Sequence, residues 1–224
     1  MDTTFNDPHR SAGSPRGLDA AVLDNTLLAY FHGLSREDKQ YIKNSMRWAE
    51  NRADLRHDRE RDPAQWFELY SGGLWSVGWS LEHQPVIVID SHHTGSLVDT
   101  WSNALSTQVS RAKLSLIKQA FGQLEHNRPA LELMTSCARQ SGDFRFLPAE
   151  YNRTGELEIL VTHVRLLSWN WNTSVLFWEV ESAQAQLDIR VRRFSAKPRE
   201  MNKYRETLSE AVKAMRLREI ALTT

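Results

Sequence analysis

The stretch that decides the fold runs from Glu156 to Phe194 and reads ELEILVTHVRLLSWNWNTSVLFWEVESAQAQLDIRVRRF. Apolar and polar residues alternate in Glu156–Thr162 and again in Leu187–Arg192, and Val175–Val180 is a nearly continuous apolar run. Alternation with a period of two places one set of side chains on a buried face and the other set in water. The stretch therefore predicts three successive strands of a twisted antiparallel sheet.

Two tryptophans lie in the turn-like segment that joins the first two of these runs. Trp169 and Trp171 alternate with Asn170 and Asn172, so both rings project from the same side of a strand end. Large aromatic side chains at such a position either close the core or form a contact surface, and they are enriched at interfaces. We take these four residues as the candidate interaction surface and keep closure of the core as the alternative.

The N-terminal half carries patterns that are typical of helices. Apolar residues recur at helical spacing across Asp19–Phe31, and Ser35 followed by Asp38 resembles a capping box that opens a second helix. Asp62-Pro63, an N-cap acid followed by proline, predicts the start of a third helix. The Gly72-Gly73 pair inside that helix either weakens it or lets another backbone approach closely.

Between these helices and the sheet, the chain alternates charged and apolar segments. Arg52–Asp62 is almost entirely of alternating charge, which is typical of a solvated helix end or loop. Pro85–Asp90 predicts a short buried strand, and Ser96 is placed to cap the helix that follows it. Ser106 or Thr107 is then expected to cap the next helix.

The remaining elements complete the predicted order. Ala130–Ala138 fits a helix or a strand, and we favour a strand because Ser141–Asp143 resembles a hairpin turn. Helices that precede a run of strands indicate an α+β fold, with a helical N-terminal half packed on an antiparallel sheet and a C-terminal helix that closes it. The plan is a flexible tail (1–18) and one domain (19–224), with helices at about 19–124, the sheet at about 130–194 and the last helix at about 199–220.

The composition limits the class of protein. Among the 224 residues, 28 basic and 28 acidic side chains cancel, so no overall field recruits nucleic acid or an anionic membrane. The single cysteine, Cys137, has no partner for an internal disulfide, which fits a reducing compartment. No stretch has the pattern of a signal peptide or the length of a membrane-spanning helix. We therefore expect a cytoplasmic protein, or one secreted without a cleaved signal peptide.

The segment Asp90-Ser91-His92-His93 is the strongest candidate for catalysis, because loops after strands often present functional groups. A carboxylate and imidazoles are ligands that zinc accepts, so Asp90 with His92 would centre a metal-dependent hydrolase. Adjacent side chains on an extended chain point to opposite sides, so His92 and His93 do not readily share one ion. We therefore expect a polar loop and no cofactor, with the metal site as the alternative.

Two further patterns were weighed for chemistry. Cys137 would act as a nucleophile only if a distant histidine such as His163 folded beside it, and a buried inert thiol is the simpler interpretation. Arg190–Lys203 is locally basic with interleaved aromatic residues, a pattern that contacts phosphate backbones. Interspersed glutamates favour instead a strand edge that positive charge guards, and no nucleic acid partner.

Two segments resemble a known family. Leu34-Ser35-x-x-Asp38-Lys39 with Asn44-Ser45, then Asp62-Pro63-x-x-Trp66-Phe67 and Gly78-Trp79, are similar to a family of small bacterial and fungal proteins. Some members resemble the accessory proteins encoded beside multi-component α-helical pore-forming toxins of Gram-negative bacteria. The match covers roughly Asp24 to Trp79. It implies an interaction or secretion-accessory role and no enzymatic activity, and it supplies no catalytic residues.

These observations lead to one functional hypothesis and two alternatives. The leading hypothesis is a non-enzymatic binding or accessory protein with a protein partner, associated with a bacterial toxin system and virulence. The first alternative is a metal-dependent, hydrolase-like enzyme centred on Asp90, His92 and His93. The second is a membrane-active toxin component that inserts Trp169 and Trp171.

Overall fold

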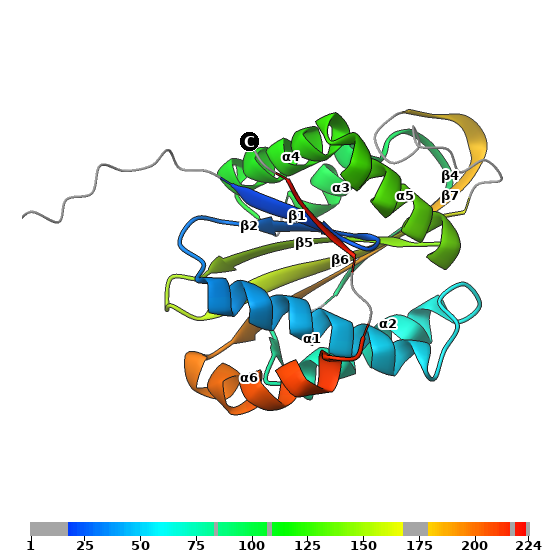
Figure 1. The fold of residues 1–224 in the computed structure, drawn as a ribbon. Coiled ribbons are helices and arrows are strands. Elements are labelled where there is room, and N and C mark those ends of the chain that lie inside the picture. Colours follow the sequence, from blue (N-terminus) through cyan, green and yellow to red (C-terminus); the bar gives the residue numbers. More distant parts are fainter. Residues whose placement is uncertain (1–17, 83–84, 107–108, 168–178, 216–217, 223–224) are drawn as a thin grey trace, which may run out of the picture.

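The computed structural model describes residues 18–82, 85–106, 109–167, 179–215 and 218–222, and within them a single sheet lies between two layers of helices (Figure 1). The strands are β1 (Asp19–Leu23), β2 (Thr26–Tyr30), β3 (Ser80–Leu81), β4 (Val86–Ser96), β5 (Phe144–Tyr151), β6 (Leu157–Leu167), β7 (Glu179–Ala196) and β8 (Glu219–Leu222). The helices are α1 (Arg36–Asp54), α2 (Pro63–Trp75), α3 (Leu97–Leu105), α4 (Arg111–His126), α5 (Arg128–Ser141) and α6 (Pro198–Val212).

The sheet has the strand order β3-β7-β6-β5-β2-β1-β8, and β4 pairs with the same side of β7 as β3 does. All pairings among these strands are antiparallel except that of β2 with β5, which is parallel. β7 has 18 residues and is long enough to pair with both β3 and β4, one after the other along its length. This mostly antiparallel sheet with its helices confirms the predicted α+β class.

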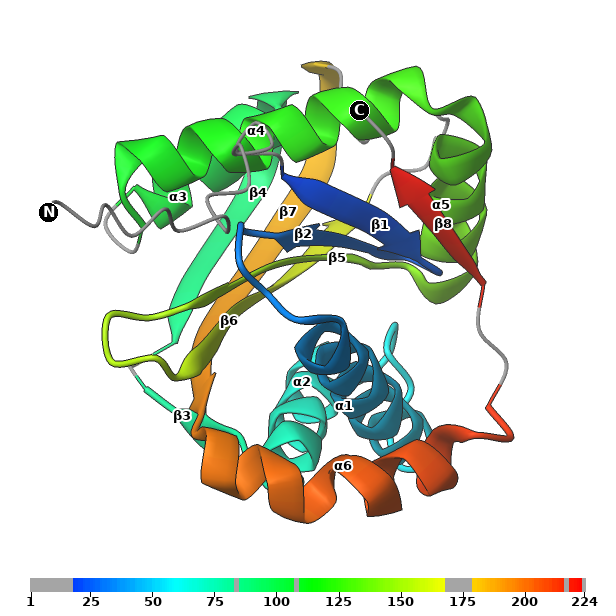
Figure 2. The ribbon, with the colours of Figure 1, turned by 60° about the vertical axis from the view of Figure 1, so that its left-hand side comes forward.

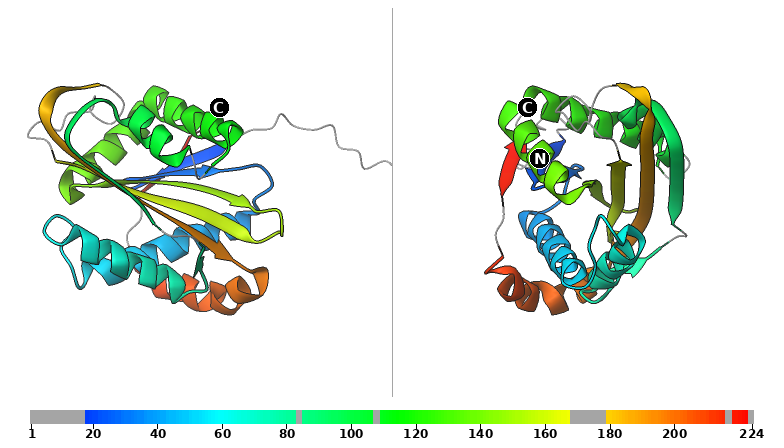
Figure 3. Two further views of the ribbon diagram at one scale, coloured as in Figure 1. Left: turned by 180° about the vertical axis from the view of Figure 1, so that it is seen from behind. Right: turned by 90° about the vertical axis from the view of Figure 1, so that its right-hand side faces the viewer.

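Each face of the sheet packs against its own helical layer (Figures 2 and 3). The upper layer consists of α3, α4 and α5, and the Trp101 ring meets Phe146 edge-on at 4.7 Å between centroids. The lower layer consists of α1, α2 and α6, and its core includes the fully buried side chains of Trp66, Phe67 and Tyr70. Two separate cores on one sheet define a three-layer arrangement.

Several local predictions are confirmed. The Ser35 hydroxyl caps α1 by accepting a hydrogen bond from the Asp38 backbone N–H at 3.0 Å, and Ser96 caps α3 in the same way. Helix α2 begins at Pro63 after Asp62, as the N-cap pattern indicates. Gly73 provides the close approach, since a Cβ there would lie 2.7 Å from the Ala49 Cα of α1.

The helix predicted for Asp19–Phe31 is wrong, because the chain forms the hairpin of β1 and β2 around Asp24, whose φ is +50°. Nine of these ten strand residues are buried, so neither strand shows the polar–apolar alternation that reveals a one-sided strand. Apolar runs of that length satisfy helical spacing equally well. The cap predicted at Ser106 or Thr107 is also wrong, since Ser110 caps α4.

The strand predicted at Ala130–Ala138 is helix α5 instead. Asn127 caps it, Pro129 occupies its first turn, and Gly142 ends it in the left-handed conformation at φ +70°. The last helix stops at Val212, well before the predicted end, and β8 then pairs with β1. Groups of strands and groups of helices therefore follow one another along the chain, and this order differs from the predicted succession of helices and then strands.

Candidate functional site

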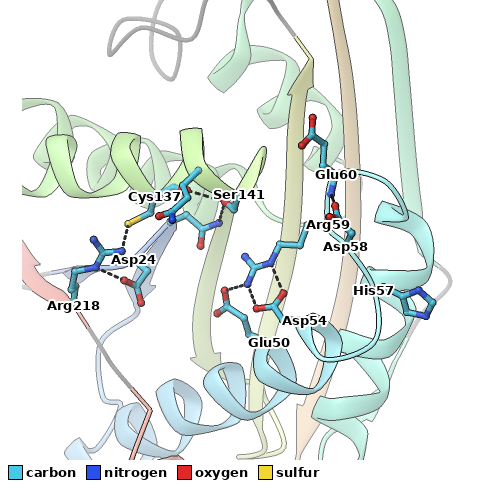
Figure 4. Close-up of a pocket in the computed structure, with 12 residues that line it drawn as sticks. Asp24, Glu50, Asp54, His57, Asp58, Arg59, Glu60, Cys137, Ser141 and Arg218 are labelled. Atoms are coloured by element: carbon cyan, nitrogen blue, oxygen red, sulfur yellow. Dashed lines mark hydrogen bonds and ion pairs between the residues drawn. The ribbon is translucent and has the colours of Figure 1, made fainter.

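A polar pocket of about 510 Å³ opens where the lower helical layer meets one end of the sheet (Figure 4). Its wall is built from the turn between β1 and β2, the C-terminal half of α1 with the charged loop after it, the last turn of α5, and Arg218 just before β8. Segments that are far apart in the sequence thus contribute to one concave surface, and most of its side chains are charged or polar.

Arg59 is the centre of the pocket's charge network. Its guanidinium donates to Asp54 through two bonds of 2.7 and 2.6 Å, pairs with Glu50, and lies 4.6 Å from the centre of the Trp66 ring. Burial disfavours its charge, yet Glu50 and the neighbouring aspartates raise its pKa further above the ordinary value. The predicted solvated loop is therefore wrong at this residue, because its side chain is only 14% exposed.

Beneath the pocket, a buried polar cluster joins the sheet to the lower layer. Asp143 accepts hydrogen bonds from Asn25 at 2.9 Å and pairs with His163 Nε2 at 2.8 Å. Arg145 donates to Asn25 at 2.6 Å and to Glu50 at 2.7 Å. Burial raises the pKa of Asp143, but the bond to His163 and the nearby arginines outweigh it and hold the pKa well below its usual range.

The Asp143–His163 pair resembles a catalytic dyad in its bonding but not in its access. Both side chains are almost fully buried, and the imidazole stacks on the Trp66 ring and on the Phe67 ring, with a centroid distance of 5.3 Å in each case. A general base must come within hydrogen-bond reach of a substrate. These two residues therefore serve to connect the sheet to α1 and α2.

Cys137 lines the pocket beside Arg218, but burial outweighs the effect of this neighbouring cation on the pKa of the thiol. Its Sγ accepts a hydrogen bond of 3.1 Å from Arg218, which also pairs with Asp24 at 3.0 Å. Burial raises the pKa of the Cys137 thiol, so the neutral form is favoured. The predicted alternative in which His163 activates Cys137 finds no support, because His163 pairs with Asp143.

The predicted catalytic segment lies inside strand β4 and not in a loop. Residues 90, 93, 95 and 96 all have register partners in β7, with irregularities between Asp90 and His93 and between His93 and Gly95. Of the predicted ligands, only Asp90 has a described side chain, and it is half-buried. Within the described residues, no group of three or more metal-ligating side chains converges. The roles given to Asp90, His92 and His93 remain predictions.

The predicted interaction surface of Trp169, Asn170, Trp171 and Asn172 lies outside the described residues. The basic stretch from Arg190 does not guard an edge as predicted, because β7 has strands on both sides. Three of its arginines are paired with acids: Arg190 with Asp188 at 3.1 Å, Arg192 with Glu68 at 3.0 Å and Arg193 with Glu158 at 3.1 Å.

The exposed edge of the sheet is the feature that the sequence did not reveal. Pro85–Asp90 is not a buried strand: Ile87 and Ile89 are 55% and 57% exposed, while Val86 and Val88 pack partly against the upper core. β4 is the outermost strand on this side, and in the described part of the chain only β7 pairs with it (Figure 3). Four successive apolar residues hide a one-sided pattern, because alternation cannot be seen in them.

Comparison with known proteins yields no family. No family model matches the chain, and no curated protein matches it. Two solved structures share some of its arrangement: one described as "DELTA-ENDOTOXIN" is 12% identical with a TM-score of 0.39, over 88% of this chain and 91% of that one. The other, "Structure of the Evf virulence factor", is 10% identical with a TM-score of 0.34, over 84% and 81%. Similarities of this size assign no residue a role.

None of the helices in the described ranges is both long enough and apolar enough to span a bilayer.

Proposed function

We propose that this chain is a non-enzymatic binding protein whose β4 edge, defined as residues Val86–Asp90, pairs with a strand of another protein. The observation that carries this proposal is the pair Ile87 and Ile89, which are more than half exposed on the outermost strand. Large apolar side chains rarely lie together on a strand edge unless something covers them.

The backbone of such an edge can bind an incoming strand through main-chain hydrogen bonds. An edge strand presents N–H and C=O groups that an incoming strand satisfies, while alternate side chains give specificity. Folded proteins usually block edges with lysine, proline, a bulge or a very short strand. The β4 edge contains neither lysine nor proline, and its register with β7 is regular from Val86 to Asp90 before the first irregularity.

The described pocket supports binding in preference to chemistry for the same chain. Its central arginine is neutralised by acids, and the Asp143–His163 pair is buried below the pocket floor. From the sequence resemblance over Asp24–Trp79 we further propose that this chain is an accessory protein of a bacterial toxin system. That part of the proposal rests on the resemblance alone.

Affinity capture with matched variants tests the binding role. The tagged chain would be compared with Ile87→Lys/Ile89→Lys, and with Leu55→Lys as control, because Leu55 is 74% exposed but lies at the end of α1. We expect one stoichiometric partner that the β4 variant loses and the control keeps.

A fourth sample separates the two candidate surfaces. If Trp169→Ala/Trp171→Ala loses the partner while Ile87→Lys/Ile89→Lys retains it, the β4 edge is not the binding surface. The same conclusion follows if no sample captures either another protein or an untagged copy of the chain. Circular dichroism of each variant shows whether a loss of binding reflects a loss of folding.

A further inference from the structure

We infer that the β4 edge accepts a second copy of this chain, so that two sheets join through antiparallel β4 strands around a two-fold axis at Val88. This inference rests on the proposed function, because it names the partner of the same edge. Most homo-oligomers with one interface are two-fold dimers in which the same patch meets itself, so the patch must be self-complementary.

The register of β4 provides that self-complementarity. When two identical strands pair antiparallel around Val88, Ile87 of each copy lies directly opposite Ile89 of the other. Directly opposed residues project from the same face, with Cβ atoms about 4.5–5.5 Å apart. Four isoleucines that are each more than half exposed in one chain therefore cover one another in the pair. If the register between the two β4 strands shifted by one residue, isoleucine would lie opposite valine, and the isoleucines of the two copies would project from opposite faces of the joined sheet.

The strand behind this edge is also arranged for a two-fold pair. In β7, Arg190 lies beside Ile87 and Asp188 lies beside Ile89. Each row across the joined sheet therefore runs from Asp188 of one copy through the two isoleucines to Arg190 of the other. Opposite charges thus flank the apolar strip symmetrically.

Electrostatic repulsion does not oppose the approach of a second copy. Asp188 and Arg190 already neutralise each other within a chain, at 3.1 Å. The whole chain has 28 basic and 28 acidic side chains and a formal net charge of +0. Proteins with a large net charge repel their own copies, and this chain lacks that protection against self-association.

The length of the regular edge fits a small, symmetric ladder. Irregularities in the β4–β7 register begin after Asp90. Such irregularities bend a strand and end its regular pairing. Residues 86–89 of the β4 edge are thus the part that can continue the sheet. Their alternation leaves Val86 and Val88 on the upper core while Ile87 and Ile89 face the opposite side.

Sedimentation velocity on the purified chain tests the inference. The wild-type protein is expected to sediment with twice its mass of 25.9 kDa, and Leu55→Lys is expected to do the same. Ile87→Lys/Ile89→Lys should sediment as a monomer, because like charges placed directly opposite on paired strands destabilise the pairing. A monomeric wild-type protein at all concentrations would overturn the inference, as would a dimer that survives the double substitution.

A second measurement tests the register. Chains with Ile87→Cys and chains with Ile89→Cys, one of them tagged, would be mixed and oxidised. The mixed disulfide should form faster than a disulfide in either variant alone, because only residues 87 and 89 are directly opposed. Equal rates would overturn the two-fold at Val88. If the chain is monomeric yet the capture experiment yields a different partner through β4, the self-pairing fails while the proposed function stands.

Discussion

The packing of α1 on α2 leads to a sharp prediction at two adjacent glycines. A Cβ at Gly73 would lie 2.7 Å from the Cα of Ala49 and 3.0 Å from its Cβ, so one helix backbone would have to move. A Cβ at Gly72 would have no heavy atom within 4 Å. Both glycines are inside α2, so the intrinsic preference of the helix for alanine applies equally to each.

The expected magnitudes follow from two opposing terms. Replacing glycine by alanine inside a helix stabilises it by roughly 0.5–1 kcal/mol. Overpacking of a well-packed core costs about 1–3 kcal/mol, and here the clash is with backbone, which cannot rotate away. We therefore expect Gly72→Ala to raise the free energy of unfolding by about 0.5–1 kcal/mol. Gly73→Ala should lower it by about 1–2 kcal/mol once the two terms are combined.

Urea unfolding followed by circular dichroism measures both changes in the same conditions. Linear extrapolation gives the free energy of unfolding in water, and equal slopes for the two variants show that the unfolded states are comparable. The packing of α1 on α2 would be refuted if Gly73→Ala proved as stable as Gly72→Ala, or more stable than the wild-type protein.

Two further predictions concern the charge network beneath the pocket. Glu50→Gln should lower the free energy of unfolding by about 3 kcal/mol, because it leaves the buried Arg145 without its carboxylate partner. We take the lower end of the range for a broken buried pair, since the Glu50 side chain is 24% exposed. Glu50→Asp, which keeps the charge, should recover part of that loss in the same urea titration, and no difference between the two variants would contradict the pairing. Acid pH should also destabilise the fold: arginines hold the pKa of Glu50 below its ordinary value despite burial, and Asp143 behaves likewise. Their contribution is complete above the unfolded pKa of about 4 and is lost as the pH falls through the lower folded values, so the urea midpoint should drop below pH of about 4 and drop less in Glu50→Gln.

The sequence predicts those parts of the fold whose pattern is local. Ser35 marks the start of α1 through a side-chain cap within one turn, and Pro63 marks the start of α2 at its first position, although the Asp62 side chain makes no capping bond. The alternation in Glu156–Thr162 falls on β6, which begins at Leu157, although helices cover both faces of that strand. Such signals depend on neighbours in the chain, and they need no knowledge of the partner strand.

The elements that were predicted wrongly depend on distant contacts. β1 and β2 are covered on both faces by the two helical layers, so burial removes the alternation that would identify strands. α5 was mistaken for a strand because Gly142 fits both a hairpin turn and a left-handed helix end. In both cases the local sequence fits a helix and a strand equally well, and contacts with distant parts of the chain determine which of the two forms.

The candidate site shows the same division. Arg59 lies in a run of alternating charge that is typical of solvent-exposed segments. Its side chain is nevertheless mostly buried, because the guanidinium contacts Glu50, Asp54 and the Trp66 ring. No spacing in the sequence indicates that its partners come from helices on either side. Likewise, the exposure of Ile87 and Ile89 follows from the position of β4 at the outside of the sheet, which only the strand order reveals.

The claim that a second copy pairs with the β4 edge is tested most directly by amide hydrogen exchange. The wild-type chain and Ile87→Lys/Ile89→Lys would be compared at the highest concentration that sedimentation allows, with the edge strand β8 as internal reference. The account predicts slow exchange across Val86–Asp90 in the wild-type chain, fast exchange in the variant, and equal exchange of β8 in both. If Val86–Asp90 exchanges at the same rate in the two proteins, no second copy pairs with the β4 edge and the self-pairing is contradicted.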